Sequence, residues 1–215
     1  MVCMTMDHVG YALFPHILWL RILGRLAFPI YAFMIAEGCR HTRSMTRYFG
    51  SMALLAGLCQ IVSYVAMDSL YMCILVTFSI SILLIGLLKL AQKKQSAFFH
   101  LLFLAGVAVA LFVCQGLPTL LPGTDFAVDY GFIGVMLPVC LYSVKDKSSN
   151  SAVMLLGLVL LATVSETSVQ WYGLLAVPLL LLYNGKRGKL NLKWFFYLFY
   201  PVHLAVIQLL VYFVK

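Results

Sequence analysis

The chain has 215 residues, of which 63% are hydrophobic and only 10% are charged, and its mean hydropathy is +1.00. Soluble globular proteins carry about 25% charged residues, so this composition excludes a soluble protein and predicts an all-α, polytopic membrane protein. The formal net charge of +8 could suggest a nucleic-acid partner, but the basic residues lie where membrane topology requires them, and we expect no nucleic-acid binding.

Nine apolar segments follow one another along the chain, and we interpret them as a transmembrane helix bundle of about eight or nine spans. They are residues 1–14, 17–39, 44–66, 71–90, 97–115, 127–144, 152–165, 169–183 and 194–214. Polar residues 165–168 separate the seventh segment from the eighth, but residues 152–183 also fit one long kinked helix with a re-entrant portion. The chain has no long linker, which predicts a single domain over residues 1–215.

The first segment is short for a membrane span. Only fourteen residues precede Pro15, whereas about 20 residues are needed to cross the hydrocarbon core. The segment lacks the basic n-region of a signal peptide, and Asp7 and His8 interrupt its apolar run. We therefore expect either that this helix begins within the membrane or that the natural start lies further upstream.

Basic residues are concentrated in alternate loops, those after the second, fourth, sixth and eighth segments. These loops and the adjoining helix ends hold Arg40, Arg43, Arg47, Lys89, Lys93, Lys94, Lys145, Lys147, Lys186, Arg187, Lys189 and Lys193. The intervening loops hold Asp68, Asp125, Asp129 and Glu166. The positive-inside rule places the basic loops in the cytoplasm. We therefore expect a cytoplasmic N-terminus and a multi-pass protein of the cytoplasmic (inner) membrane, with lipids as its surroundings.

Ionisable residues also lie inside the first two apolar segments. Each costs at least about 2.5–3.5 kcal/mol near the bilayer centre, which favours a functional polar site. Asp7 and Arg25 each lie nine residues from His16 at the turn, which places both about 13 Å below it. We predict that they pair, with Arg21 one helical turn away on the same face. Such an ion pair could also be purely architectural and hold the two helices together.

Two histidines lie near the middle of the membrane, His8 in the first segment and His203 in the last. Histidine exchanges a proton near neutral pH, and a nearby carboxylate tunes it. Together with Asp7 and the two arginines they indicate a reactive centre, provided that the first and last segments are neighbours. Each histidine could instead be a satisfied hydrogen-bonding residue.

A second polar group ends the second segment. Glu37 is expected to pair with Arg40, Arg43 or a group on another segment. The cluster of Arg40, His41, Arg43 and Arg47 could also receive a phosphorylated cytoplasmic cofactor, in addition to setting topology. The six cysteines form no C-x-x-C pair, and we predict no metal site.

Several stretches of this sequence resemble the TraX family. They are Met6–Tyr11, Leu23–Phe33, Ala36–Arg43, Asp129–Val135 and Phe199–Leu204. The combination of R-x-A-F-P at Arg25–Pro29 with A-E-G-x-x-H-T-R at Ala36–Arg43 is the most specific part. The resemblance extends from one end of the chain to the other.

The resemblance implies a polytopic membrane acetyltransferase that uses acetyl-CoA as its co-substrate. The namesake of the family acetylates the N-terminal amine of conjugative F-type pilin. The family is distantly similar to membrane acyltransferases such as the heparan-α-glucosaminide N-acetyltransferases, which are thought to use a membrane-embedded histidine. The pilin acceptor does not transfer to this chain, for which we expect a protein, glycan or small-molecule acceptor that bears an amine or a hydroxyl.

Roles for the polar residues follow from this resemblance. His8 would act as the base or as a transient acetyl carrier, oriented by Asp7 and assisted by His203. Substrate and the developing oxyanion would be bound by Arg21, Arg25 and Glu37. Acetyl-CoA would be bound on the cytoplasmic side by Arg40, His41 and Arg43.

Two other classes of function also fit these residues. A proton-coupled transporter would use the same Asp, His and Arg side chains as a relay, although we detect no internal repeat of the kind common in transporters. A non-catalytic scaffold or assembly factor would need the ion pair only for its architecture.

Overall fold

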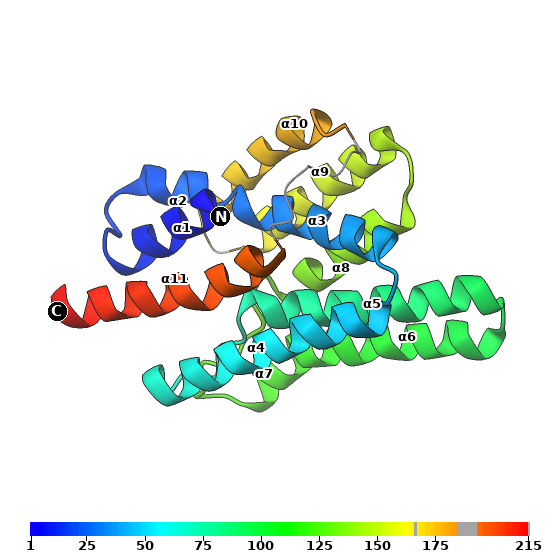
Figure 1. Cartoon of the computed structure of the whole chain (residues 1–215), viewed down its shortest axis with the longest axis horizontal. Coiled ribbons are helices and arrows are strands. Elements are labelled where there is room, and N and C mark those ends of the chain that lie inside the picture. The colour runs from blue at the N-terminus through cyan, green and yellow to red at the C-terminus, as the bar shows by residue number, and fades with distance from the viewer. Residues whose placement is uncertain (166, 185–192, 215) are drawn as a thin grey trace. The chain divides into compact units, whose positions relative to one another are not determined.

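The structure is a computed structural model that describes residues 1–165, 167–184 and 193–214. These residues are mostly helical, with one isolated β-bridge between Met72 and Val128 (Figure 1). Five described helices are long and apolar enough to cross a membrane: Leu18–His41, Met45–Val65, Ile74–Lys94, Ala97–Leu120 and Lys147–Val164. Shorter apolar helices cover Gly131–Ser143, Ser168–Leu181 and Leu198–Val211. The all-α membrane class is confirmed, while eight or nine spans and a cytoplasmic N-terminus stay predictions.

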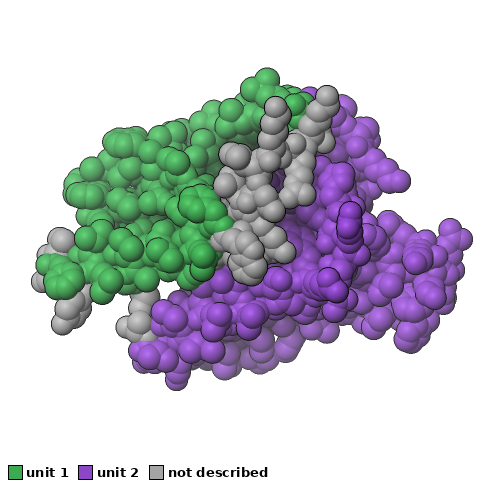
Figure 2. All heavy atoms as spheres, viewed as in Figure 1, with its two compact units in different colours: residues 1–31, 154–215 green, residues 32–153 purple. Residues whose placement is uncertain are grey.

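The chain divides into two compact units, which Figure 2 shows in different colours. The first unit joins Met1–Tyr31 to Met154–Lys215, and the second is Ala32–Val153. The expectation of a single domain stays a prediction.

The first unit brings the two ends of the chain together. It contains α1 (Val2–Ala12), α2 (Leu18–Gly24), the start of α3 (Ala27–His41), most of α9 (Lys147–Val164), the 3-10 helix η2 (Ser168–Leu175), α10 (Ala176–Leu181) and α11 (Lys193–Val214). Helices α1 and α2 form a hairpin, α11 packs beside α1, and η2 packs against α2 (Figure 1). The first and last apolar segments are therefore neighbours, which is the condition for a shared site.

Two glycines allow α1 and α2 to approach closely. A Cβ atom on Gly24 would lie only 2.4 Å from Cβ of Asp7, and one on Gly10 would lie 2.9 Å from Cβ of Leu20. Small residues at helix contacts let backbones come together in membrane proteins. Gly24 therefore places Asp7 directly against α2, next to Arg21 of that helix and to Arg25, which follows its last residue.

The second predicted segment is broken between α2 and α3. Residues 25 and 26 leave the helix, and α3 begins at Ala27. Pro29 then lies in the first turn of α3, where its missing N–H removes no helical hydrogen bond. In a continuous helix its ring would clash with the carbonyl of Arg25, four residues earlier. The break between the two helices leaves Arg25 at their junction.

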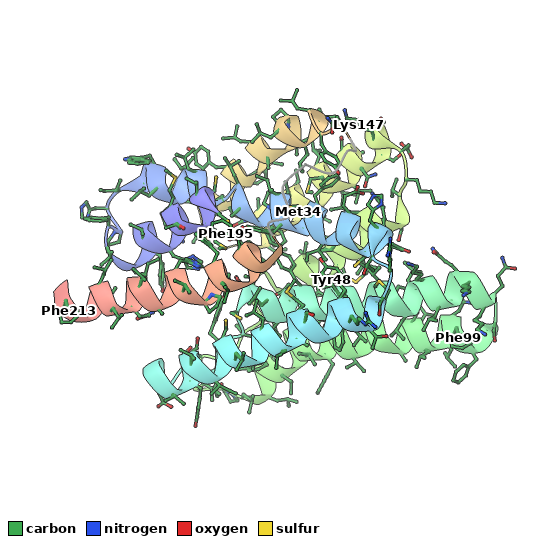
Figure 3. All side chains as sticks on the ribbon, in the orientation of Figure 1. Met34, Tyr48, Phe99, Lys147, Phe195 and Phe213 are labelled. Carbon is green, nitrogen blue, oxygen red and sulfur yellow. The ribbon has the colours of Figure 1, made fainter. Side chains whose placement is uncertain are left out.

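The second unit is built around α5 (Ile74–Lys94). This helix packs against α4 (Met45–Met67), α6 (Ala97–Leu111) and α8 (Gly131–Ser143), while the π-helix η1 (Phe112–Gly116) and α7 (Leu117–Leu120) extend α6. The side chains of Ile82, Leu84 and Ile85 are almost fully buried. At the end of α3, Gly38 lies against the ring of Tyr48 on α4, a residue labelled in Figure 3. This contact positions the polar end of α3.

Residues 152–183 form two helical segments. Helix α9 ends at Val164 and η2 begins at Ser168, so the break expected at the polar residues 165–168 is present. Whether residues 152–183 make two spans or one span with a re-entrant portion stays a prediction. Glu166 of this break lies outside the described residues. So do Lys186, Arg187 and Lys189 of the last predicted basic loop.

Candidate active site

Asp7 is held by two arginines across the α1–α2 hairpin. Nη2 of Arg25 donates to both carboxylate oxygens, at 2.6 and 2.5 Å, and Nη1 of Arg21 lies 3.2 Å from Oδ1. The side chains of Asp7 and Arg25 are 17% and 12% exposed. The predicted pairing is confirmed, and the contact of both carboxylate oxygens with one guanidinium fixes the carboxylate.

Arg21 makes weaker contacts than Arg25. Its side chain is 23% exposed, and Nη1 also donates to the backbone carbonyl of Asp7 at 3.4 Å. Its guanidinium carbon lies 5.2 Å from the centre of the Tyr11 ring, within range of a cation–π interaction. Because Arg21 is less tightly held, its guanidinium is the better placed of the two to turn towards a ligand.

Gln170, a residue that sequence analysis missed, links the ion pair to η2. Nη1 of Arg25 donates to Oε1 of Gln170 at 3.2 Å, and the Gln170 side chain is buried. A single neutral polar residue in an apolar segment carries no charge to mark it. The signal available in the sequence was only that Gln170 follows the polar break at residues 165–168.

The two predicted histidines meet between α1 and α11. Nε2 of His203 lies 3.2 Å from Nδ1 of His8. Each Nδ1 also contacts a carbonyl one turn back on its own helix, that of Met4 at 2.9 Å and that of Phe199 at 2.8 Å. Because a carbonyl can only accept, we assign a proton to each Nδ1 in the neutral rings. The single Nδ1–H of His8 is then shared between two acceptors, the Met4 carbonyl and Nε2 of His203.

Aromatic rings of α11 hold His203 in place. Phe199 stacks on His203 with ring centres 5.1 Å apart, and Tyr200 meets the same ring edge-on at 5.3 Å. Phe195, labelled in Figure 3, packs on Phe199 at 5.8 Å. His203 is only 7% exposed, whereas His8 is half-buried and its Nε2 has no hydrogen-bond partner among the described residues. In this tautomer Nε2 of His8 carries a lone pair.

A polar chain therefore crosses the first unit. His203 contacts His8, the adjacent Asp7 binds Arg25, and Arg25 binds Gln170. This polar chain of side chains joins α11, α1, α2 and η2 in an otherwise apolar bundle. Chemically it offers one imidazole nitrogen that has no hydrogen-bond partner among the described residues, a fixed carboxylate and two guanidinium groups.

Glu37 and Arg40 form a separate polar group in the second unit. Nη1 of Arg40 donates to Oε1 of Glu37, and Nη2 donates to the carbonyls of Leu141 and Val144 at the end of α8. Nη2 also lies 3.4 Å from Oδ1 of Asn150. The expected Glu37–Arg40 pair is confirmed. Arg40 additionally caps the C-terminus of α8, a role that sequence analysis missed because backbone acceptors leave no sequence signal.

His41 and Arg43 lie on the surface beside this group. The His41 side chain is 74% exposed, with Nε2 3.6 Å from Glu37, and Arg43 is exposed in the connection to α4. Their predicted part in binding a cofactor stays a prediction. In the described part of the chain, no three His, Cys, Asp or Glu side chains are placed to hold a metal ion.

The fold and this polar chain define an integral-membrane helical protein with paired charges and paired histidines buried in its first unit. The family model described as TraX protein matches residues 1–211, and the chain belongs to the TraX family. It is also similar to the probable fimbrial assembly protein FimC, serogroup H1, of Dichelobacter nodosus, with 25% identity over 96% of this chain and 90% of that protein. No solved structure matches the chain.

Proposed function

We propose that this protein is an acetyltransferase of the inner membrane, which moves an acetyl group from cytoplasmic acetyl-CoA to an amine or hydroxyl acceptor. The observation that carries the proposal is the contact between His8 and His203 beside the Asp7–Arg25 pair. Membership of the TraX family supports it. The name of the similar protein refers to fimbrial assembly, which favours a fimbrial or pilus subunit as the acceptor.

His8 is the base in this mechanism. Its Nε2 takes the proton from an acceptor amine as the amine nitrogen attacks the thioester carbon of acetyl-CoA. A C–N bond forms and the C–S bond breaks, so that the departing thiolate takes the proton from His8. The products are the acetylated amine and free CoA.

The neighbouring residues prepare His8 and stabilise the charge that develops. Nε2 of His203 accepts a hydrogen bond from Nδ1–H of His8. This hydrogen bond orients the His8 ring and strengthens when that ring becomes cationic. Asp7 adds negative charge next to His8. Arg21 polarises the thioester carbonyl as its oxygen becomes negative, while Arg25 keeps Asp7 in position.

Acetyl-CoA reaches the protein from the cytoplasm in this proposal. The exposed His41 and Arg43 are suited to its phosphates, because a guanidinium binds phosphate oxygens through charge-assisted hydrogen bonds. Arg40 contributes positive charge from a fixed position, since its Nη atoms are engaged with Glu37 and α8.

A non-catalytic assembly factor is the second candidate. The printed name of the similar protein favours it, and the Asp7–Arg25 pair would then serve only to hold α1 on α2. In that case the histidines carry out no chemistry, and their removal changes neither acetyl transfer nor CoA release.

An activity assay distinguishes the two candidate functions. Purified protein in lipid nanodiscs is incubated with labelled acetyl-CoA and cell membranes. Thiol release and transfer of label are measured for His8→Ala and His203→Ala. We expect a loss of about 10²-fold or more for His8→Ala and about tenfold or more for His203→Ala. The matched control is His100→Ala, because exposed His100 makes the same Nδ1 contact, at 2.9 Å, with the carbonyl of Ser96.

We expect thiol release and transfer of label by the His100→Ala control to equal those of the wild-type protein. Undiminished transfer by both His8→Ala and His203→Ala would remove histidine chemistry from the mechanism. A wild-type protein that releases no thiol in the presence of membranes would favour the assembly factor.

A further inference from the structure

Gln170 carries a buried hydrogen-bond donor that no described residue satisfies. The side chain is 4% exposed, and its Oε1 accepts from Arg25 at 3.2 Å. A guanidinium can only donate, so this contact directs the amide oxygen to Arg25 and the amide nitrogen away from it. Nε2 has no hydrogen-bond partner among the described residues. Native proteins satisfy most buried donors, so this one points to a ligand.

A small space lies beside this nitrogen. A Cβ atom on Gly173 would lie 4.0 Å from Nε2 of Gln170, 3.8 Å from Cδ2 of Leu158 and 3.6 Å from the carbonyl oxygen of Arg25. These are ordinary van der Waals distances, so the glycine leaves room there for a group about the size of a methyl. The surrounding 3-10 helix runs for eight residues, whereas runs beyond three or four are uncommon.

We propose that Nε2 of Gln170 donates a hydrogen bond to a carbonyl oxygen of the bound acyl donor, which makes Gln170 a ligand-binding residue. The inference rests on the proposed function. A carbonyl fits because the nitrogen can only donate and because the guanidinium of Arg25 is also a donor, so a cationic amine would be repelled. Acetyl-CoA offers two kinds of carbonyl, the acetyl thioester and the amides of its pantetheine arm.

The variant Gln170→Glu isolates the donor. Glutamate keeps an oxygen for Arg25 and replaces Nε2 with a second oxygen, so the link to α2 remains and the donor is lost. Equilibrium binding of radiolabelled acetyl-CoA and of CoA is measured on the purified full chain in nanodiscs, together with Tm. We expect acetyl-CoA to bind about tenfold more weakly, with Tm no lower than wild type. Gln92→Glu, exposed at the end of α5, is the matched control and should bind normally.

Comparison of the two probes identifies the carbonyl. Weaker binding of acetyl-CoA alone indicates the thioester carbonyl, and equally weaker binding of CoA indicates an amide of the pantetheine arm; both support the inference. A second variant, Gly173→Ala, fills the space beside Nε2 without a contact below 3.4 Å, and it should also weaken binding. If Gln170→Glu does not fold, wild-type affinity in Gly173→Ala overturns the inference.

The failure of this inference differs from the failure of the proposed function. If wild-type protein binds acetyl-CoA and Gln170→Glu binds it equally well, Gln170 is not a ligand-binding residue and the acetyltransferase proposal stands. If the wild-type protein binds no acetyl-CoA, the proposed function is wrong, and the role of Gln170 falls with it.

Discussion

Nε2 of His203 lies 3.2 Å from Nδ1 of His8, although 195 positions separate them in the chain. Each ring is also oriented by a carbonyl of its own helix, so neither depends on the other alone for its position. The two imidazoles therefore form one prearranged unit, in which His203 acts through His8. This assigns His203 a positioning role.

A positioning role for His203 predicts that a hydrogen-bond acceptor can partly replace it. In His203→Gln the side-chain Oε1 can accept from Nδ1 of His8, whereas in His203→Phe no acceptor remains. We expect His203→Phe to lower acetyl transfer by about tenfold or more, since hydrogen bonds to a charged group contribute about 1.5–3 kcal/mol. His203→Gln should retain most of the activity in the same thiol-release assay. Equal loss in both variants would instead indicate that His203 itself takes up a proton.

Variants of the Asp7–Arg25 pair distinguish a structural role of the pair from a role in acetyl transfer. Asp7→Leu and Arg25→Leu each leave a buried charge without its main partner, and we expect each to lower the free energy of unfolding by about 3–5 kcal/mol. The double variant removes both charges and should recover much of that loss. Reversible unfolding in mixed micelles, followed by circular dichroism, measures the three values.

Acetyl transfer in the same double variant tests the chemistry. We expect it to stay low even where the fold is restored, because the fixed carboxylate next to His8 is gone. A stable double variant with wild-type transfer would show that the pair serves only to hold α1 on α2.

The sequence predicted those parts of the site that depend on local counting. Asp7 and Arg25 lie equally far from one tight turn, so a hairpin brings them together without any knowledge of the remaining fold. The meeting of His8 with His203 depends instead on which helices become neighbours, and nothing in one apolar segment specifies its partner. Gln170 was missed for a related reason, because its importance comes only from its contact with Arg25.

Gly24 is predicted to be intolerant of any side chain. A Cβ atom there would lie 2.4 Å from Cβ and 2.7 Å from Cα of Asp7, so Gly24→Ala must push α1 away from α2. Overpacking of this kind costs about 1–3 kcal/mol, and transfer should fall because Asp7 moves away from Arg25. Thermal unfolding and thiol release measure the two effects.

Gly57→Ala is the matched control. Gly57 lies in α4 and a Cβ atom there would meet nothing within 4 Å. Alanine is favoured over glycine within helices by about 0.5–1 kcal/mol, so this variant should be as stable as wild type or more so. A similar loss of stability in both variants would contradict the close packing at Gly24.

We predict that the contact made by Asp125 between two loops of the second unit depends on pH. Its carboxylate accepts from Oγ of Ser69 at 2.5 Å and from the amide of Leu70 at 2.8 Å. These hydrogen bonds lower the pKa of Asp125 below its ordinary value of 3.8, because they favour the charged form. The contact is therefore present above pH 3.8 and is lost as the pH falls through the lowered pKa.

The Leu70 amide reports this transition directly. Its NMR chemical shift in the wild-type protein should titrate with a midpoint below 3.8, and the titration should be absent in Asp125→Asn. A midpoint at or above 3.8 in the wild-type protein would contradict the loop contact.

We predict that Arg40 and Arg43 have different roles, although both belong to one basic cluster: Arg40 stabilises the fold and Arg43 binds acetyl-CoA. Arg40→Met removes the donors to the carbonyls of Leu141 and Val144 and leaves Glu37 without its guanidinium partner. We expect a loss of about 1–3 kcal/mol in unfolding free energy and a lower Tm. Arg43→Met should leave Tm unchanged, because Arg43 is exposed, and should weaken the binding of acetyl-CoA.

Raising the ionic strength further distinguishes the stability loss of Arg40→Met from the affinity loss of Arg43→Met. A phosphate contact at an exposed arginine is screened as ionic strength rises, so the affinity difference between wild type and Arg43→Met should shrink in high salt. The stability defect of Arg40→Met comes from partly buried hydrogen bonds and should persist. If Arg40→Met kept the wild-type Tm and lost affinity in the salt-dependent manner expected of Arg43→Met, Arg40 would be a residue that binds the co-substrate, and its cap on α8 would contribute little to the fold.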